Sequence, residues 1–86
     1  MKTYQTIYRD VCDMICDAKD LEQGDLSPET PLQQLRLDSL DYVELMVLAK
    51  REFAVTVDAD TFASRPNLTL GELCQYLFDA QPQPAS

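Results

Sequence analysis

Residues 35–53, LRLDSLDYVELMVLAKREF, place a serine at the start of an amphipathic helix. Asp38 is the expected N-cap, because Asp is among the residues that best accept hydrogen bonds from the free N–H groups of a first turn. The helix should then run from Ser39 to about Phe53. One face of it gathers the side chains expected in the core, namely Tyr42, Leu45, Met46, Ala49 and Phe53.

A second apolar stripe follows the same helix at spacing i, i+3 and i+7, in Leu40, Val43 and Val47. Leu48 falls instead among charged residues, where burial in the same core is geometrically awkward. The helix is thus more apolar than packing on one side requires. Either more of the chain covers it, or it presents apolar residues to a ligand or a partner.

The sequence before this stretch predicts a first helix and a long connection. Apolar side chains recur with helical spacing from Tyr4 to about Lys19, and three aspartates fall on the opposite face. Residues 20–37 carry four leucines that we expect to hold the connection against the core: Leu26, Leu32, Leu35 and Leu37. A connection of this length indicates a crossing from one end of a bundle to the other.

After residue 53 the sequence predicts an extended connector at 54–57, a short helix near 58–64 and a last helix. Thr69 begins a T-x-x-E capping box, and helical spacing continues to about Ala80. We therefore expect an all-α fold, a small four-helix bundle of three longer helices plus one short third helix. A long loop should join helices one and two. Residues 1–80 should form one helical domain, and the tail 81–86, QPQPAS, should be disordered.

The charge balance excludes one class of function. Fifteen acidic residues against seven basic ones give a net charge of −8, so the chain repels nucleic acid and anionic membrane surfaces. Long-range steering favours partners with basic patches, although plain solubility explains the charge equally well. The chain has no histidine, which argues against Ser–His or Cys–His catalysis and removes the commonest metal ligand.

The three cysteines do not make a disulfide framework. Cys12 and Cys16 lie one turn apart in the first helix, Cys74 lies far along the chain, and at least one of the first two thiols is expected to be exposed. Without histidine or a CxxC motif we expect no metal site and reduced thiols in a cytoplasmic protein. We find no segment that resembles a signal peptide or is long enough to span a membrane.

Ser39 is the residue best placed for chemistry. Backbone N–H groups of a first helical turn are unpaired, so a phosphate ester there would meet the positive end of the helix dipole. Asp38 and Asp41 oppose that attraction, which favours covalent modification by an enzyme over spontaneous anion binding. The four letters D-S-L-D alone fit a simple helix start just as well.

The wider pattern resembles the acyl carrier protein family over residues 4–80. The specific part is the run Leu35-x-x-Asp38-Ser39-Leu40-Asp41-x-Val43-Glu44-Leu45, followed by Glu52-Phe53 at the family's distance. The resemblance implies a stand-alone, non-catalytic carrier in which Ser39 bears a covalent 4′-phosphopantetheine arm. The terminal thiol of that arm holds acyl groups as thioesters and presents them to enzymes of fatty-acid, polyketide or aryl-polyene synthesis.

The resemblance also implies partners. These are a phosphopantetheinyl transferase and the enzymes of a synthase: a ketosynthase, an acyltransferase or acyl-ligase, a ketoreductase and a dehydratase. Whether the chain forms a tight complex with a synthase subunit stays open. The candidates for docking or acyl contact are Asp38, Leu40, Asp41, Val43, Glu44, Val47, Leu48 and Arg51.

Three positions depart from the familiar fatty-acid carriers. Arg36 stands where they commonly have glycine, and Lys50 and Arg51 stand where they are usually acidic. We therefore expect a carrier dedicated to one pathway, such as a polyketide or aryl-polyene synthase. Two alternatives stay open: a peptidyl or aminoacyl carrier protein, and an unmodified acidic interaction module that docks through residues 39–53.

Overall fold

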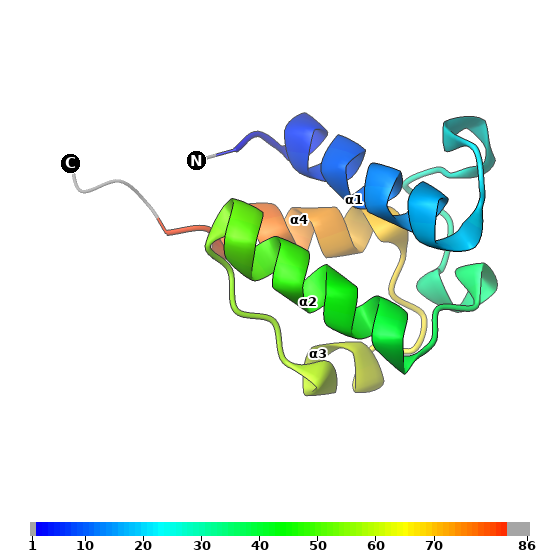
Figure 1. The fold of residues 1–86 in the computed structure, drawn as a ribbon. Helices are drawn as coiled ribbons and strands as arrows, with labels where there is room; N and C mark the ends of the chain where they lie inside the picture. Colours follow the sequence, from blue (N-terminus) through cyan, green and yellow to red (C-terminus); the bar gives the residue numbers. More distant parts are fainter. Residues whose placement is uncertain (1, 83–86) are drawn as a thin grey trace.

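The computed structural model describes residues 2–82 and contains the four helices in the expected order (Figure 1). They are α1 (Tyr4–Lys19), α2 (Ser39–Phe53), α3 (Ala59–Ala63) and α4 (Leu70–Ala80). The prediction of an all-α bundle with a short third helix is confirmed. In Figure 1, α1 lies along one side of α4, and α2 lies between α1 and α3.

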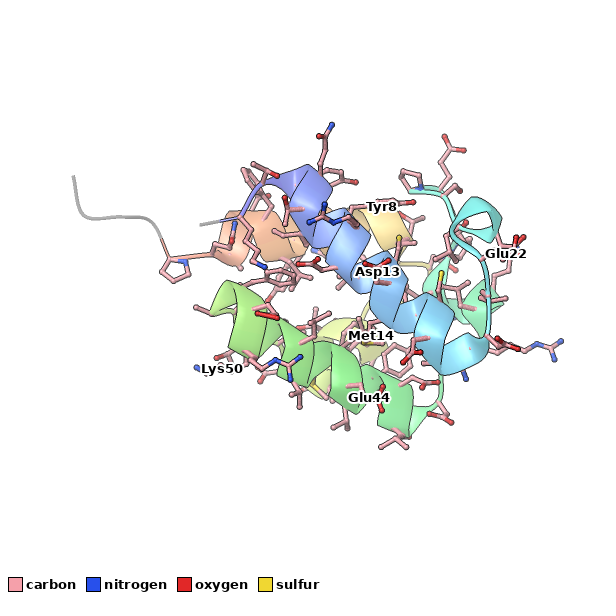
Figure 2. The ribbon with its side chains drawn as sticks, turned by 45° about the horizontal axis from the view of Figure 1, so that its top comes forward. Tyr8, Asp13, Met14, Glu22, Glu44 and Lys50 are labelled. Carbon is pink, nitrogen blue, oxygen red and sulfur yellow. The ribbon has the colours of Figure 1, made fainter. Side chains whose placement is uncertain are left out.

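Helix α1 has a side-chain cap at its start and a left-handed residue at its end. The Thr3 hydroxyl accepts a hydrogen bond from the N–H of Thr6 at 3.2 Å and caps the first turn. Asp20 ends the helix in the left-handed conformation, with φ of 56°. The buried face consists of Ile7, Val11, Cys12 and Ile15. Met14 lies between α1 and α2 (Figure 2) and packs against the same core.

The long connection between α1 and α2 is fixed to the molecule by its leucines. Leu26 and Leu32 are buried, and Leu35 and Leu37 are half-buried against the core, as expected. Two short 3-10 turns, Gln23–Asp25 and Leu32–Leu35, shape its course. The connection therefore holds its last residues, which lead into α2, in a defined position.

Gly71 lets this connection approach the start of α4. Its N–H donates to the carbonyl of Pro28 at 2.8 Å. A Cβ on Gly71 would lie 2.8 Å from both that carbonyl oxygen and the Pro28 Cβ, so a larger residue would force the two segments apart. Beside this contact, Pro31 and Thr69 form a single antiparallel bridge.

The chain after α2 is extended, as predicted, and buries Val55 and Val57 before α3 begins. Helix α4 has the predicted capping box at Thr69. Its end departs from expectation, because Gln81 is buried and exchanges two 2.8 Å hydrogen bonds with the Lys2 backbone. Gln81 thus belongs to the folded domain, whereas 83–86 of the expected disordered tail lie outside the described residues.

Candidate functional site

The motif around Ser39 forms a reciprocal cap at the start of α2. The Asp38 carboxylate accepts from the N–H of Asp41 at 2.9 Å, and the Asp41 carboxylate accepts from the N–H of Asp38 at 3.2 Å. Two otherwise unpaired backbone donors are satisfied in this way. The cap fixes the direction in which the first turn, and with it Ser39, leaves the preceding loop.

Ser39 is the first helical residue of α2, and its side chain is exposed. Its hydroxyl has no hydrogen-bond partner anywhere in the described part of the chain. A hydroxyl in this position is accessible to an enzyme that approaches along the helix axis. The backbone N–H groups beside it are the usual binding groups for a phosphate at a helix N-terminus.

The predicted second stripe of α2 is exposed to solvent. Leu40 is 66% exposed, Val43 45% and Val47 52%. The expectation for Leu48 is wrong, because its side chain is half-buried against the core. Leu48 lies three residues after buried Leu45 and seven after Asp41, whose carboxylate pairs with Lys19, so it stands on the side of α2 that faces α1. The docking role of Leu48 stays a prediction.

A groove of about 390 Å³ lies beside Ser39, between α2 and α3. The Tyr42 and Phe62 rings contact each other in it, with centroids 4.8 Å apart. Apart from Ser39 its lining is mainly apolar and comes from Tyr42, Val43, Met46, Ala59, Phe62 and Ala63. The sequence predicts the short third helix but not its position beside the serine.

A second groove, of about 580 Å³, follows the C-terminal half of α2. Val43, Met46, Val47 and Val57 give it an apolar floor, and Lys50 and Arg51 form its charged end together with Thr56. Within residues 2–82 neither cation makes an ion pair, although Lys50 donates a 3.4 Å hydrogen bond to the Thr56 hydroxyl. Glu44 and Lys50 project from opposite halves of α2 (Figure 2).

Asp41, one of the docking candidates, is buried and forms an ion pair between α2 and α1. It is only 7% exposed, and its carboxylate lies 2.6 Å from the ammonium of Lys19, the last residue of α1. The hydrogen bond from Lys19, followed by the one from the Asp38 N–H, lowers the pKa of Asp41 below its ordinary value. The same hydrogen bond raises the pKa of Lys19. The Asp41 charge is therefore largely offset where it stands.

Arg36 has a backbone conformation that ordinarily favours glycine. It follows the second 3-10 turn with φ of 56°, in the left-handed region that favours glycine. Its side chain is exposed. The backbone at position 36 is thus left-handed although the residue there is not glycine, and that residue, Arg36, adds a positive charge two positions before Asp38.

The three cysteines are free thiols. Cys12 and Cys74 are buried, whereas Cys16 is partly accessible, as expected for one of the first two. Burial is the largest cause that raises the pKa of Cys12 and Cys16, and it raises the pKa of Cys74 to about 12. None of the three is activated as a nucleophile.

Residues 9–77 match the protein family described as "Phosphopantetheine attachment site". This chain belongs to that family. Its cofactor is 4′-phosphopantetheine, bound covalently to a serine, and the chain is a phosphopantetheine carrier. Among residues 2–82, no group of three or more His, Cys, Asp or Glu side chains could hold a metal ion. In the same range, no helix combines the length and the hydropathy needed to cross a membrane.

Two curated relatives are fungal synthases. A non-reducing polyketide synthase of Penicillium rubens is 35% identical over 58 residues, and one of Preussia isomera is 42% identical over 64 residues. These stretches cover 67% and 74% of this chain but only 2% and 3% of the two synthases. The chain therefore corresponds to a small part of these relatives.

Sequence reasoning missed two sets of residues near the serine. The role of Lys19 could not be predicted from the sequence, because a lysine at the end of a helix is common and its partner, Asp41, lies 22 residues further along the chain. Phe62 and its neighbours in α3 had a weak signal, an apolar pattern too short to say which helix it would face. Asp38 as the N-cap, in contrast, was predicted from local rules, although the return hydrogen bond to the Asp41 side chain was not.

Proposed function

We propose that this chain is an acyl carrier of a polyketide-type synthase and that Ser39 bears its phosphopantetheine arm. The observation that carries the proposal is the state of the serine hydroxyls in the region that matches the family. The Ser27 hydroxyl lies 2.9 Å from a threonine hydroxyl, and Ser64 donates to a backbone carbonyl at 2.7 Å. Of these three serines in the described chain, Ser39 alone is both exposed and without such a partner.

The surroundings of Ser39 fit the arm. The first turn of α2 offers backbone N–H groups to a phosphodiester, and the two neighbouring carboxylates are engaged in the cap. When bound, the arm supplies a terminal thiol that holds acyl groups as thioesters. The apolar groove between α2 and α3 opens beside the hydroxyl and supports contact with an apolar cargo.

The chain is proposed to be a substrate of its partner enzymes and not a catalyst. It has no histidine, its thiols are not activated, and a tethered cargo needs only a high effective concentration at each partner. Free thiols are typical of a reducing compartment, which supports a cytoplasmic location.

The partners proposed are a phosphopantetheinyl transferase, a ketosynthase and an acyltransferase. The relatives are non-reducing synthases by name, which favours these enzymes over a ketoreductase. The exposed residues proposed for docking are Asp38, Leu40, Val43, Glu44, Val47 and Arg51. Lys50 joins them, because it shares the charged end of the second groove with Arg51.

Intact-mass measurement tests the attachment residue. The chain is co-expressed with a phosphopantetheinyl transferase, and we expect a mass gain of one arm. Ser39→Ala should abolish the gain, whereas Ser27→Ala and Ser64→Ala should retain it. A gain that survives Ser39→Ala would show that another residue bears the arm, and no gain in the natural sequence would favour an unmodified interaction module.

A loading assay tests the cargo class. The modified chain is incubated with a polyketide acyltransferase and malonyl-coenzyme A, or with an adenylating enzyme and an amino acid. We expect a malonyl thioester in the first reaction and no aminoacyl thioester in the second. The reverse result would identify a peptidyl or aminoacyl carrier.

A further inference from the structure

The end of α1 and the start of α2 are joined by one short ion pair. Lys19 Nζ lies 2.6 Å from Asp41 Oδ2, the shorter of the two lysine ion pairs in the described chain. The other, between Lys2 and Asp10, is 3.2 Å long and lies at the start of α1. The Lys19 pair is therefore a specific link between two helices, formed next to the proposed attachment residue.

The same Asp41 oxygen has two tasks. Oδ2 accepts the hydrogen bond from the N–H of Asp38, which closes the cap, and it also pairs with Lys19. A largely buried carboxylate is costly unless it is paired and hydrogen-bonded. Without Lys19 the carboxylate would gain by turning towards solvent, and that movement would break its bond to Asp38.

Besides the cap and the ion pair, the first turn of α2 is held by the packing of one side chain, Tyr42. Of its first four residues, Ser39 and Leu40 are exposed, Asp41 is buried, and Tyr42 is half-buried with its ring against Phe62. The next residue that is fully in the core is Leu45. Tyr42 fixes this turn towards α3, whereas the side that faces α1 is held by the cap and by the ion pair that joins the cap to Lys19.

We propose that Lys19 is a positioning residue, which holds Asp41 in the cap and thereby fixes the Ser39 hydroxyl for phosphopantetheinyl transfer. The proposal rests on Ser39 being the attachment residue. Lys19 also offsets a carboxylate beside the oxygen that receives a phosphate. Lys19 itself contacts neither the transferred group nor the serine.

In the transfer, the Ser39 oxygen bonds to the phosphorus next to the pantetheine group of coenzyme A, the pyrophosphate bond breaks, adenosine 3′,5′-bisphosphate leaves, and the hydroxyl proton passes to a base of the transferase. The test compares the rates of this reaction in purified unmodified chains with a phosphopantetheinyl transferase and coenzyme A. Lys19→Met should lower kcat by roughly ten- to hundredfold with a smaller change in KM, because a misplaced hydroxyl reacts slowly after it has bound. Lys19→Arg should restore the rate. Lys2→Met is the matched control, since it removes the other lysine ion pair, and it should modify like the natural sequence.

A double variant separates positioning from direct contact with the transferase. In Lys19→Met the buried carboxylate is left unpaired, so adding Asp41→Asn removes the uncompensated charge and should recover part of kcat. If Asp41→Asn alone is fully active and the double variant remains as slow as Lys19→Met, Lys19 touches the transferase and the proposal is wrong.

Two controls distinguish a loss of positioning from a loss of folding and from a wrong attachment residue. All rates are taken well below the melting temperature of each variant, which is measured by circular dichroism. Lys19→Met that is modified at the natural rate would overturn the positioning role while leaving Ser39 as the attachment residue. Modification that persists in Ser39→Ala would overturn the proposed attachment site instead.

Discussion

Helix α2 is held by polar contacts at its N-terminal end and by apolar burial at its C-terminal end. The cap and the Lys19–Asp41 pair fix the first turn, while Ser39 itself stays exposed. At the other end Ala49 and Phe53 are buried, followed by Val55 and Val57.

The difference shows how one helix can keep the Ser39 hydroxyl accessible and still be stable. A hydroxyl that must meet an enzyme cannot be fixed by burying it, so hydrogen bonds and an ion pair beside it supply the direction. The far end can be fixed by burial, and Lys50 and Arg51 stay exposed to solvent there. Different residues thus fix the position of Ser39 and stabilise the fold, and variants should affect one without the other.

The largest expected effect is on stability, from Phe53→Ala. Phe53 is 3% exposed, and the Lys2 ammonium lies 5.5 Å from the centre of its ring. Loss of a buried Phe side chain costs about 3–5 kcal/mol of unfolding free energy, measured by urea denaturation. Phosphopantetheinyl transfer to the folded fraction should be unchanged, because the polar end of α2 is intact.

Phe53→Leu is the companion variant if the alanine variant does not fold. It should lose roughly 1 kcal/mol, in the range of conservative core changes, and modify at the natural rate. A fall in kcat for modification as large as that of Lys19→Met would show that the two ends are not independent.

The second effect comes from removing the cap. Asp38→Ala should lower the unfolding free energy by about 1 kcal/mol and also slow modification of Ser39, because both depend on the bond to the Asp41 N–H. Thr69→Ala is the matched control, since it removes the same kind of cap from α4. It should cost a similar amount of stability and leave the modification rate unchanged.

Asp38→Asn separates the cap from the charge. Asn caps helices about as well as Asp, so the variant should keep both stability and kcat. A rate as low as that of Asp38→Ala would mean that the transferase reads the Asp38 carboxylate, and the cap would then not be the reason for the slow reaction.

The third effect is a gain in stability at the opposite end. Ala54 ends α2 with φ of 57°, a conformation that costs a residue with a side chain about 1–2 kcal/mol. Ala54→Gly removes that cost but makes the unfolded chain more flexible, so the net gain should be about 0.5 kcal/mol. Arg36→Gly is the counterpart on the Ser39 side and should gain a similar amount. A loss in either variant would show that its side chain makes a contact worth more than the strain.

The sequence predicts the polar cap well and the apolar packing of α2 in part. Asp38 and the boundaries of α2 follow from local rules, because every contact of the cap lies within one turn. The exposed stripe at Val43 and Val47 follows from the period of the helix. The burial of Leu48 does not follow from the helical period, because it depends on which side of α2 faces α1.

The Lys19–Asp41 ion pair is the contact that the sequence predicts least. Lys19 and Asp41 both look like ordinary surface charges in sequence, and only the crossing of the long connection brings them together. Their placement depends on the leucines and on Gly71, which fix that connection. Contacts between residues distant in sequence therefore decide what the motif around Ser39 can do, although the motif itself is local.

The smallest expected effect is the pH dependence of this pair. The pKa of Asp41 is lowered from its ordinary 3.8, so its contribution to stability is present above pH 3.8 and is lost as the pH falls through its folded value. The pKa of Lys19 is raised from 10.5, so its contribution is present below pH 10.5 and is lost as the pH rises through its folded value. Between these values the melting temperature of the natural sequence should exceed that of the Lys19→Met, Asp41→Asn double variant by a constant amount. The difference should shrink towards zero in acid, because a protonated Asp41 no longer pairs with Lys19. A difference that persists in acid would mean that the packing of the lysine side chain, and not the ion pair, joins α1 to the start of α2.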